Sequence, residues 1–290
     1  MRGAPNIGVA AGYGLAMATA ADPRPEAIET AAATLAATRP TAVNLGGAVA
    51  RVRAAALGAA TDPAAAARAE AEAIDAAEGA ASAAVARHGA DVLAGARRVL
   101  THCNTGALAC GGEGSALAVI AELARRGDVR VLVSETRPLL QGARLTVWEL
   151  SRLGIAHELL VDGAAAGLMR RGEIDAVVVG CDRVAANGDV ANKVGTYAHA
   201  LAARAAGLPF VVAGPTSSID PELPGGDAIE IEERDADEVR HAGGALLTLA
   251  GTPCRNPAFD VTPAVLVSAL VTERGVAAPP DRASVARLLG

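Results

Sequence analysis

The chain has 290 residues, and 51% of them are hydrophobic, so it can bury a full core as one large domain or two modest ones. Its net charge of −6 excludes nucleic acid as a main partner, because no basic face is available to hold a phosphate backbone. No run of about 20 uncharged apolar residues is present, so we expect a soluble globular protein with no membrane partner.

The cysteines indicate a reducing compartment. They form no CxxC pair and have no Cys/His spacing typical of zinc, so we expect no metal. The alanine-rich opening lacks the basic region and leucine-rich core of a signal peptide, which predicts that the protein is not exported. We therefore expect a cytoplasmic location and four reduced thiols, at Cys103, Cys110, Cys181 and Cys254.

The first third of the chain is rich in alanine and predicts helices. Its breaks lie at residues 22–25, at Arg39-Pro40 and at residues 61–63, where Asp or Thr precedes a long Ala/Glu/Arg run, as at helix starts. Residues 1–95 are thus predicted to form a helical N-terminal domain of about four helices, the longest from about residue 63 to 88.

From Arg98 onward the pattern changes to short Val/Ile/Leu runs that alternate with helical stretches, which predicts βαβ units and a buried parallel sheet over residues 96–290. The fold class is therefore α/β. A last helix is expected at residues 263–273. The expected strands are 99–102, 129–134, 157–161, 176–180 and 210–213, and the expected helices between them are 115–126, 146–153, 164–171 and 195–206.

Polar side chains follow the predicted strands, at the edge where such sheets bind ligands. Cys103 precedes a turn that we expect to open a helix, whose N-terminus would favour a thiolate, although a structural role is equally compatible. Asp182 ends an apolar strand, where partial desolvation would raise its pKa and let it act as an acid. The alternative for Asp182 is a helix cap or an ion pair with Arg183.

Two polar clusters suggest a phosphorylated ligand. Asn192 and Lys193 are expected to begin a helix, where backbone N–H groups and one ammonium can hold phosphate, unless Lys193 is simply solvated. Arg137, with residues 141–144, forms the second cluster. Gly111 to Gly114 lack the third glycine of GxGxxG, which argues against NAD, and the absence of HExxH and GxSxG argues against metal-dependent and serine hydrolases.

Several blocks together resemble the methylthioribose-1-phosphate isomerase family, over essentially the whole chain. They are Arg2-Gly3-Ala4-Pro5, residues 39–45, Thr101 to Ala109, Glu135 to Thr146, Gly180 to Lys193 with residues 195–197, and Arg255 to Pro263.

This resemblance implies a helical N-terminal domain, a Rossmann-like C-terminal domain and a homodimer. It also implies isomerisation of an aldose 1-phosphate to a ketose 1-phosphate in methionine salvage, with a small phosphorylated pentose as substrate and no metal or nicotinamide cofactor. By the same resemblance Asp182 is the proton donor and Cys103 the second catalytic residue. Substrate would be bound by Arg2, Gly3, Ala4, Arg39, Gln141, Asn192 and Lys193.

The chemistry explains these residue types. A sugar whose C1 oxygen carries phosphate is locked as a ring, so an acid such as Asp182 must protonate the ring oxygen. Hydrogen then moves between C2 and C1, either as a proton through an enediolate with Cys103 as base, or as a hydride in a dry pocket with Cys103 assisting. The sequence leaves both routes open.

Members of the family carry about fifty residues before the Arg2 block, so we expect either a native start upstream of Met1 or a shortened N-terminal domain, with Arg2 on a terminus. The first hypothesis is the isomerase of 5-methylthioribose 1-phosphate. A sister activity on 5-deoxyribose 1-phosphate is the nearest alternative, ahead of a ribose 1,5-bisphosphate isomerase. A noncatalytic relative of the regulatory subunits of translation initiation factor two B is the alternative from another class.

Overall fold

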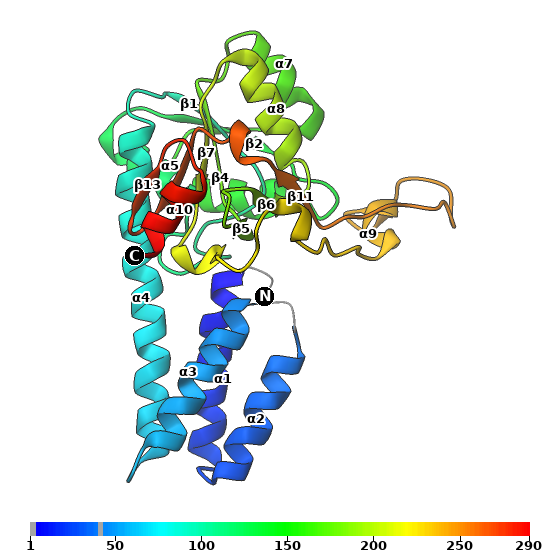
Figure 1. Cartoon of the computed structure of the whole chain (residues 1–290). Helices are drawn as coiled ribbons and strands as arrows, with labels where there is room; N and C mark the ends of the chain where they lie inside the picture. Colours follow the sequence, from blue (N-terminus) through cyan, green and yellow to red (C-terminus); the bar gives the residue numbers. More distant parts are fainter. Residues whose placement is uncertain (1–3, 40–42) are drawn as a thin grey trace. The chain divides into compact units, whose positions relative to one another are not determined.

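The computed structural model describes residues 4–39 and 43–290, which fall into two compact units (Figure 1). The helical unit comprises the chain up to Ser82 together with Ala107–Gly114, and the sheet unit comprises Ala83–Gly106 and Ser115–Gly290. The division thus lies within a long helix, and a short later segment returns to the helical unit. The domain boundary expected after residue 95 stays a prediction.

Four helices are present where the alanine-rich pattern predicts them. The helical unit packs around a cluster of small and branched apolar side chains that includes Leu15, Ile28 and Val52, each at most 1% exposed. Alanine dominates the rest of this cluster, which lets the helix backbones approach closely. The helices are α1 (Ala4–Ala21), α2 (Pro25–Ala37), α3 (Val43–Gly58) and α4 (Pro63–Val92), the last of which continues into the sheet unit.

A seven-stranded sheet forms the sheet unit, in the order β13-β12-β7-β4-β1-β2-β3. Six strands are parallel, and β13 alone pairs antiparallel. The five strands expected from the sequence are all confirmed within one or two residues. The strands are β1 (Arg98–Thr101), β2 (Arg130–Ser134), β3 (His157–Leu160), β4 (Ala176–Val179), β7 (Phe210–Ala213), β12 (Ala269–Thr272) and β13 (Gly275–Ala277).

Helices cover both faces of this sheet, because successive strand residues point to opposite sides. Val99, Val131 and Val178 pack on one face against α5 (Ala116–Arg126), α6 (Val147–Arg152) and the end of α4. Leu100, Leu132 and the other set of alternate residues pack on the opposite face. That face is covered by α7 (Ala165–Arg170), α8 (Thr196–Ala206) and α10 (Arg282–Leu289). The fold is therefore the expected doubly covered α/β arrangement.

A second, four-stranded sheet lies in the order β11-β6-β5-β8. Its strands are β5 (Arg183–Ala185), β6 (Val190–Lys193), β8 (Ile219–Asp220) and β11 (Phe259–Thr262). The helix expected at residues 263–273 is wrong, because this segment forms a short 3-10 turn and then strand β12. Its apolar residues are β-branched to a large extent, and they join the parallel sheet beside β7.

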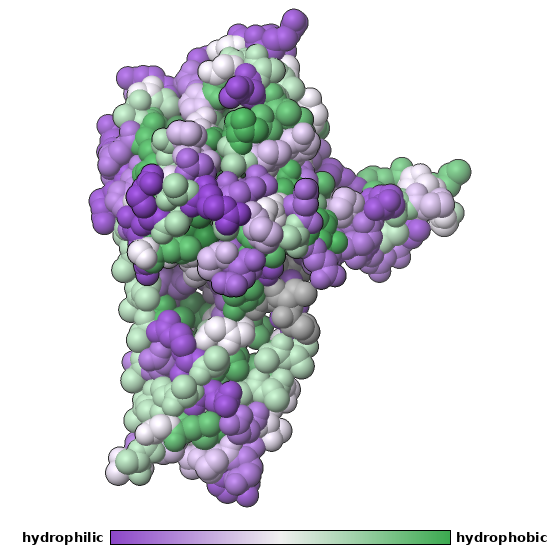
Figure 2. Space-filling model, in the orientation of Figure 1, coloured by the Kyte–Doolittle hydropathy of each residue, from purple (hydrophilic) through white to green (hydrophobic). Residues whose placement is uncertain are grey.

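A segment built from α9 (Ala236–Arg240), β9 (His241–Ala242) and β10 (Ala245–Leu246) extends from the sheet unit (Figure 1). Figure 2 shows hydrophobic and hydrophilic residues mixed along it. Three leucines near its end are about half exposed or more, at Leu246, Leu247 and Leu249. Among all the residues that the structure describes, no helix is both long enough and apolar enough to span a membrane.

Candidate active site

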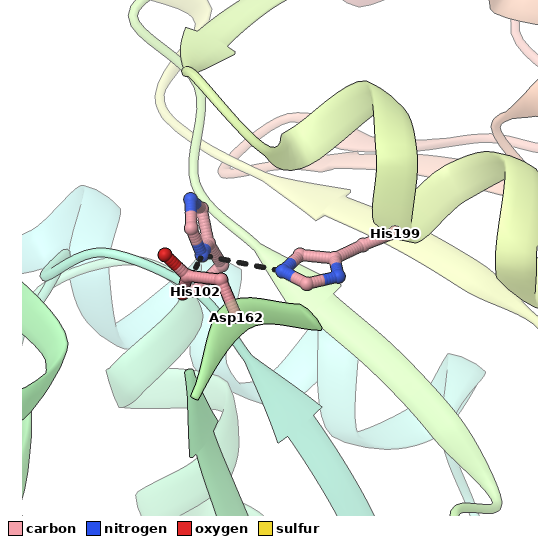
Figure 3. A group of neighbouring side chains, drawn as sticks. All are labelled: His102, Asp162 and His199. Atoms are coloured by element: carbon pink, nitrogen blue, oxygen red, sulfur yellow. Dashed lines mark hydrogen bonds and ion pairs between the residues drawn. The ribbon is translucent and has the colours of Figure 1, made fainter. Parts of the chain in front are cut away.

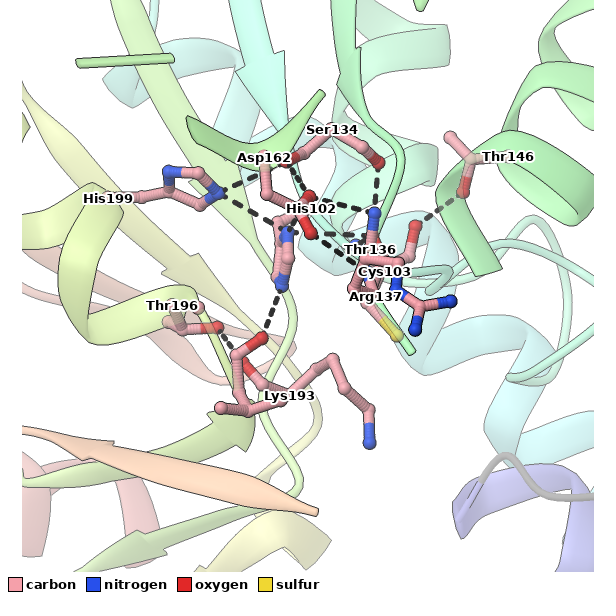
Figure 4. A network of polar contacts seen from close by, with 12 residues as sticks. His102, Cys103, Ser134, Thr136, Arg137, Thr146, Asp162, Lys193, Thr196 and His199 are labelled. Atoms are coloured by element: carbon pink, nitrogen blue, oxygen red, sulfur yellow. Dashed lines mark hydrogen bonds and ion pairs between the residues drawn. The ribbon is translucent and has the colours of Figure 1, made fainter. Parts of the chain in front are cut away.

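Cys103 lies just beyond the carboxyl end of β1, in a backbone conformation that L-residues rarely adopt. Its φ is 66°, and that of Thr136 beyond β2 is 67°. The two residues are joined, because the Cys103 backbone N–H donates to Thr136 Oγ1 at 2.8 Å (Figure 4). Thr146 Oγ1 in turn donates to the Cys103 carbonyl at 2.6 Å. Strained residues held by several contacts mark functional sites.

The surroundings of Cys103 favour a protonated thiol. Burial raises its pKa to about 11, and the charge of Asp182 acts in the same direction, whereas the positive charges of Lys193 and Arg234 oppose the rise. The expected helix does not begin at this turn, since α5 starts only at Ala116. The prediction that a helix N-terminus favours a thiolate here is therefore wrong.

Lys193 is the only lysine in a chain with 25 arginines, and it is 5% exposed. Its Nζ donates to the Ala258 carbonyl at 2.6 Å and lies 4.8 Å from the centre of the Phe259 ring. Burial lowers its pKa, and the charge of Cys103 partly offsets this effect. In Figure 4 its ammonium and the Cys103 sulfur extend toward the same region.

Asn192 and Lys193 do not begin a helix as expected. They end strand β6, which pairs antiparallel with β11, and α8 starts only at Thr196. Asn192 is 2% exposed, and its Nδ2 donates to Thr196 Oγ1 at 2.9 Å. The N-terminus of α8 is occupied by Asp260, whose carboxylate accepts from the backbone N–H groups of Gly195 and Tyr197. A phosphate would therefore meet the Lys193 side chain rather than a helix end.

Asp182 follows β4 at the same edge of the sheet. Its backbone N–H donates to Ala191 at 2.9 Å, which fixes it beside β6. Its negative charge acts on both Cys103 and Lys193, so the three groups lie close together. Asp182 is exposed, however, and not partly desolvated as its position after an apolar strand suggests.

Gln141 and Arg137 come from the turn after β2 and differ in what they can bind. Oε1 of Gln141 is buried and accepts no hydrogen bond from any described residue, so it can serve a substrate hydroxyl. The guanidinium of Arg137 donates to the backbone carbonyls of Val239 and His241 at 2.7 and 3.1 Å. Arg137 thus anchors the extending segment, because these guanidinium donors are given to backbone carbonyls; its expected role in binding phosphate stays a prediction.

The remaining candidates belong to the N-terminal region. Arg2 and Gly3 lie outside the described residues. Ala4 is the first residue of α1, and Arg39 follows α2, so both belong to the helical unit. Their roles in binding substrate stay predictions.

A buried pair of histidines supports the Cys103 turn (Figure 3). His102 Nε2 lies 2.9 Å from the Val194 carbonyl, which can only accept, so this nitrogen carries the proton of the neutral ring. His102 Nδ1 then accepts, and it faces His199 Nε2 at 3.3 Å. Burial lowers the pKa of both imidazoles, that of His199 to about 3. The network ties the residue before Cys103 to the residue after Lys193.

Nitrogens of the two histidines and an oxygen of Asp162 all lie within 4.8 Å of one another, a spacing that could hold a metal ion. The Asp162 carboxylate already accepts three hydrogen bonds, from Ser134 Oγ and from the backbone N–H groups of Thr136 and Arg137. These bonds outweigh burial and lower the pKa of Asp162. An ion would have to displace those donors, so the donor set fits a hydrogen-bond network better than a metal centre.

Sequence reasoning missed several residues of this site. Arg234 and His199 come from segments that show no motif of their own, and His102 and Phe259 lie in blocks that resemble the family but were given no role. One signal in the sequence pointed to Lys193. The chain has 25 arginines and a single lysine, at this position. A compact ammonium fits a buried position that a branched guanidinium would overfill.

The profile of the Initiation factor 2 subunit family matches residues 1–279. The chain belongs to this family. It is 54% identical over 288 residues to the methylthioribose-1-phosphate isomerase of Syntrophotalea carbinolica, with 95% of this chain and 83% of the relative covered. It is 50% identical over 300 residues to the 5-deoxyribose 1-phosphate isomerase of Moorella thermoacetica, with 100% and 86% covered.

Solved structures of the family have the same fold. The 5-methylthioribose 1-phosphate isomerase of Pyrococcus horikoshii superimposes with a TM-score of 0.93 at 41% identity, covering 100% of this chain and 84% of that one. The translation initiation factor eIF-2B subunit delta of A. fulgidus superimposes with a TM-score of 0.91 at 38% identity, covering 100% and 87%. The fold class expected from the sequence is confirmed.

Proposed function

We propose that this protein is an aldose-ketose isomerase that converts 5-methylthioribose 1-phosphate to 5-methylthioribulose 1-phosphate. One observation carries the proposal: a partly buried thiol, a buried ammonium and a carboxylate, from Cys103, Lys193 and Asp182, lie within electrostatic reach of one another at the carboxyl edge of the sheet. They do so in a chain that is 54% identical to an isomerase of that name.

Asp182 is the acid of the first step. Phosphate on the C1 oxygen prevents spontaneous ring opening, so the ring oxygen must receive a proton before the C1–O bond breaks. Asp182 must carry a proton when the ring opens, and its exposed position at the sheet edge lets it take that proton from solvent and reach a bound ligand, while its backbone is fixed by Ala191. Lys193 lies close enough for its positive charge to act on the same ligand.

Cys103 takes part in the second step, the movement of hydrogen from C2 to C1. With a pKa of about 11 the thiol is protonated at neutral pH, so it cannot accept the C2 proton in its resting state. A hydride shift needs no base at the C2 carbon and is favoured where water is excluded. The proton of the C2 hydroxyl must leave as the carbonyl forms, and the Asp182 carboxylate left by the first step can accept it. This protonation state therefore favours the hydride route, with Cys103 placed against the migrating hydrogen.

The identity of the C5 substituent is the open choice between two substrates. The relative from Moorella thermoacetica is named for 5-deoxyribose 1-phosphate and is 50% identical. The two sugars differ only in an apolar group, which pockets distinguish by about 1–3 kcal/mol. We place 5-methylthioribose 1-phosphate first and 5-deoxyribose 1-phosphate second.

We further propose a cytoplasmic homodimer with no nucleic acid partner. All four cysteines are free, which suits a reducing compartment. The negative net charge speaks against binding a phosphate backbone. Leu246, Leu247 and Leu249 give the extending segment an apolar end that a second copy can cover.

The test is ketose 1-phosphate formation from each sugar by the full chain and by Asp182→Asn. We expect turnover by the full chain, and a loss of at least about a hundredfold in Asp182→Asn, because removal of a general acid has effects of this size. Asp227→Asn, which changes an exposed carboxylate on a 3-10 turn, should keep full activity.

Failure of both sugars to react would reject the isomerase and favour the noncatalytic role of the initiation factor relatives. Equal turnover by Asp182→Asn and the unchanged chain would reject Asp182 as the proton donor. The ratio of kcat/KM for the two sugars ranks them as substrates.

A further inference from the structure

Two cationic side chains lie against one aromatic ring next to the candidate catalytic thiol. Arg234 Cζ is 5.5 Å and Lys193 Nζ is 4.8 Å from the centre of the Phe259 ring. The Arg234 side chain is only 13% exposed. Cations rest favourably on an aromatic face, so Phe259 can hold both groups in place without neutralising them.

Backbone pairing fixes these positions. Phe259 lies directly opposite Lys193 in the β11–β6 ladder. The Arg234 backbone N–H donates to the Asn256 carbonyl at 2.9 Å, and the Ala258 N–H donates to Glu232 at 2.8 Å. The segment that carries Arg234 is thus paired with the segment that leads into β11, and the two cations are held on a common frame.

The positive charges of Arg234 and Lys193 both act on Cys103, and Arg234 also acts on Lys193. The carboxylate that pairs with Arg234, from Glu232, is half exposed and at 3.3 Å. Asp182 and Glu238 act on Lys193 from a distance, and Glu238 also accepts from Asn256 Nδ2 at 3.2 Å. These carboxylates offset the repulsion between the two weakly exposed cations only in part, because Glu232 is half exposed, so an anion that contacts both cations would be favoured.

We propose that Arg234 and Lys193 together form a two-cation site that binds the phosphate group of the substrate, with Arg234 as a binding residue. This inference rests on the proposed function. The phosphate is attached to the C1 oxygen, a few bonds from the C1–C2 bond at which hydrogen moves. An anion site beside Cys103 therefore places the reacting carbons next to the thiol.

Each cation has a distinct part in this site. The Lys193 ammonium has three donors, of which one is given to Ala258, and acts as a point charge. The Arg234 guanidinium is planar and can bind two phosphate oxygens in parallel. A doubly charged phosphate monoester matches the two cations, whereas an unphosphorylated sugar brings no negative charge to them.

The single lysine permits a direct test that does not depend on turnover. Expression with carbon-13-labelled lysine gives one Cε signal, from Lys193, which can be followed by NMR while inorganic phosphate is added. We expect a saturable shift in the unchanged chain. Arg234→Gln should weaken phosphate binding by about tenfold to a hundredfold, the range for loss of a hydrogen bond between charged groups.

The matched control is Arg255→Gln. Arg255 directly precedes Asn256, whose carbonyl accepts from Arg234, but its side chain is 88% exposed and pairs with Glu233. It should keep the phosphate affinity of the unchanged chain. The pKa of Lys193 should rise in Arg234→Gln, since a positive charge that lowers it is removed, and it should be unchanged in Arg255→Gln.

Wild-type phosphate affinity in a folded Arg234→Gln, or no response of the Lys193 signal in the unchanged chain, would overturn the proposal. If circular dichroism shows that Arg234→Gln is unfolded, Arg234→Lys decides. Phosphate binding weakened several-fold supports the site, because the charge stays but the fork is lost, and unchanged binding rejects it.

Kinetics separate this inference from the proposed function. Where the unchanged chain turns over a sugar 1-phosphate, Arg234→Gln should raise KM by at least about tenfold. Where neither sugar reacts, the isomerase proposal fails, while the phosphate titration still decides the two-cation site.

Discussion

Cys103 shows how the environment of one residue limits its chemistry. Burial raises the pKa of its thiol to about 11, although Lys193 and Arg234 pull it down. A thiol in this state resists oxidation and alkylation at neutral pH, because the thiolate is the reactive form. The protonated thiol can still lie against a reacting carbon, and a hydride shift in a pocket without water requires only this contact from Cys103.

The protonation of Cys103 predicts its reactivity. Alkylation by iodoacetamide should accelerate about tenfold per pH unit from pH 7 to 10, since the thiolate fraction grows until the pKa is reached. Cys181, whose pKa burial raises to about 12, should react more slowly throughout and provides the internal control. Mass spectrometry of the two peptides gives both rates.

Removal of Lys193 should slow this reaction further. Lys193→Met takes away a positive charge that lowers the pKa of Cys103, so the alkylation rate at a fixed pH should fall. A Cys103 rate that levels off below pH 9, or one that is unaffected in Lys193→Met, would contradict the buried, lysine-coupled thiol.

At the scale of single elements, the turn between β2 and α6 depends on Gly142. A Cβ atom at this position would clash with the Ser134 carbonyl oxygen and contact Thr136 Oγ1, in the turn that holds Cys103. Gly142→Ala should therefore lower the free energy of unfolding by about 1–3 kcal/mol or more. Urea denaturation measures this change.

Gly163→Ala is the control for that experiment, because a Cβ atom at Gly163 has nothing within 4 Å. Its unfolding midpoint should stay close to that of the unchanged chain. Similar midpoints for the two variants would mean that the turn relaxes around a methyl group, and that its geometry is not fixed by the close approach of Gly142 to β2.

Elements with a clear period were predictable, and those fixed by distant partners were not. The five strands that the sequence predicts are mostly short apolar runs, and helices alternate with them at regular spacing, so the pattern identified both. The sequence predicts helices for the Asn192-Lys193 segment and for residues 263–273, because local composition there allows either a helix or a strand. Pairing of β6 with β11, and of β12 with β7, decides them.

The candidate site was predictable to a similar degree. The position of Cys103 and Asp182 after strands followed from the rule that ligands bind at the carboxyl ends of a parallel sheet. Arg234 and Phe259 did not follow from any rule, because Phe259 reaches the site from a second sheet with non-local pairing, and Arg234 from a loop that is hydrogen-bonded to the segment before that strand. The strain at Cys103 and Thr136 is likewise a property of tertiary contacts.

At the scale of the whole molecule, the buried histidine pair couples folding to pH. Burial lowers the pKa of His102 and His199, that of His199 to about 3, so the His199 ring stays neutral in the folded protein at pH 5. In the unfolded chain both rings take up protons below about pH 6.5. The unfolded state then binds more protons than the folded state, and stability must fall as the pH falls.

We therefore expect the free energy of unfolding to decrease between pH 6.5 and pH 5, by about 1.4 kcal/mol per pH unit for each histidine that stays neutral. Most carboxyl groups titrate near about pH 4. Burial raises the pKa of Asp260, but this carboxyl is present in every variant, so a difference in slope between variants reports the histidine that was replaced. His199→Gln should flatten the slope by about one proton, whatever its effect on stability at pH 7. His157→Gln, which replaces a histidine outside the pair, is the control variant. An unchanged slope in His199→Gln would mean that His199 is protonated in the folded protein, and would remove the neutral hydrogen-bond network that joins the Cys103 turn to the strand of Lys193.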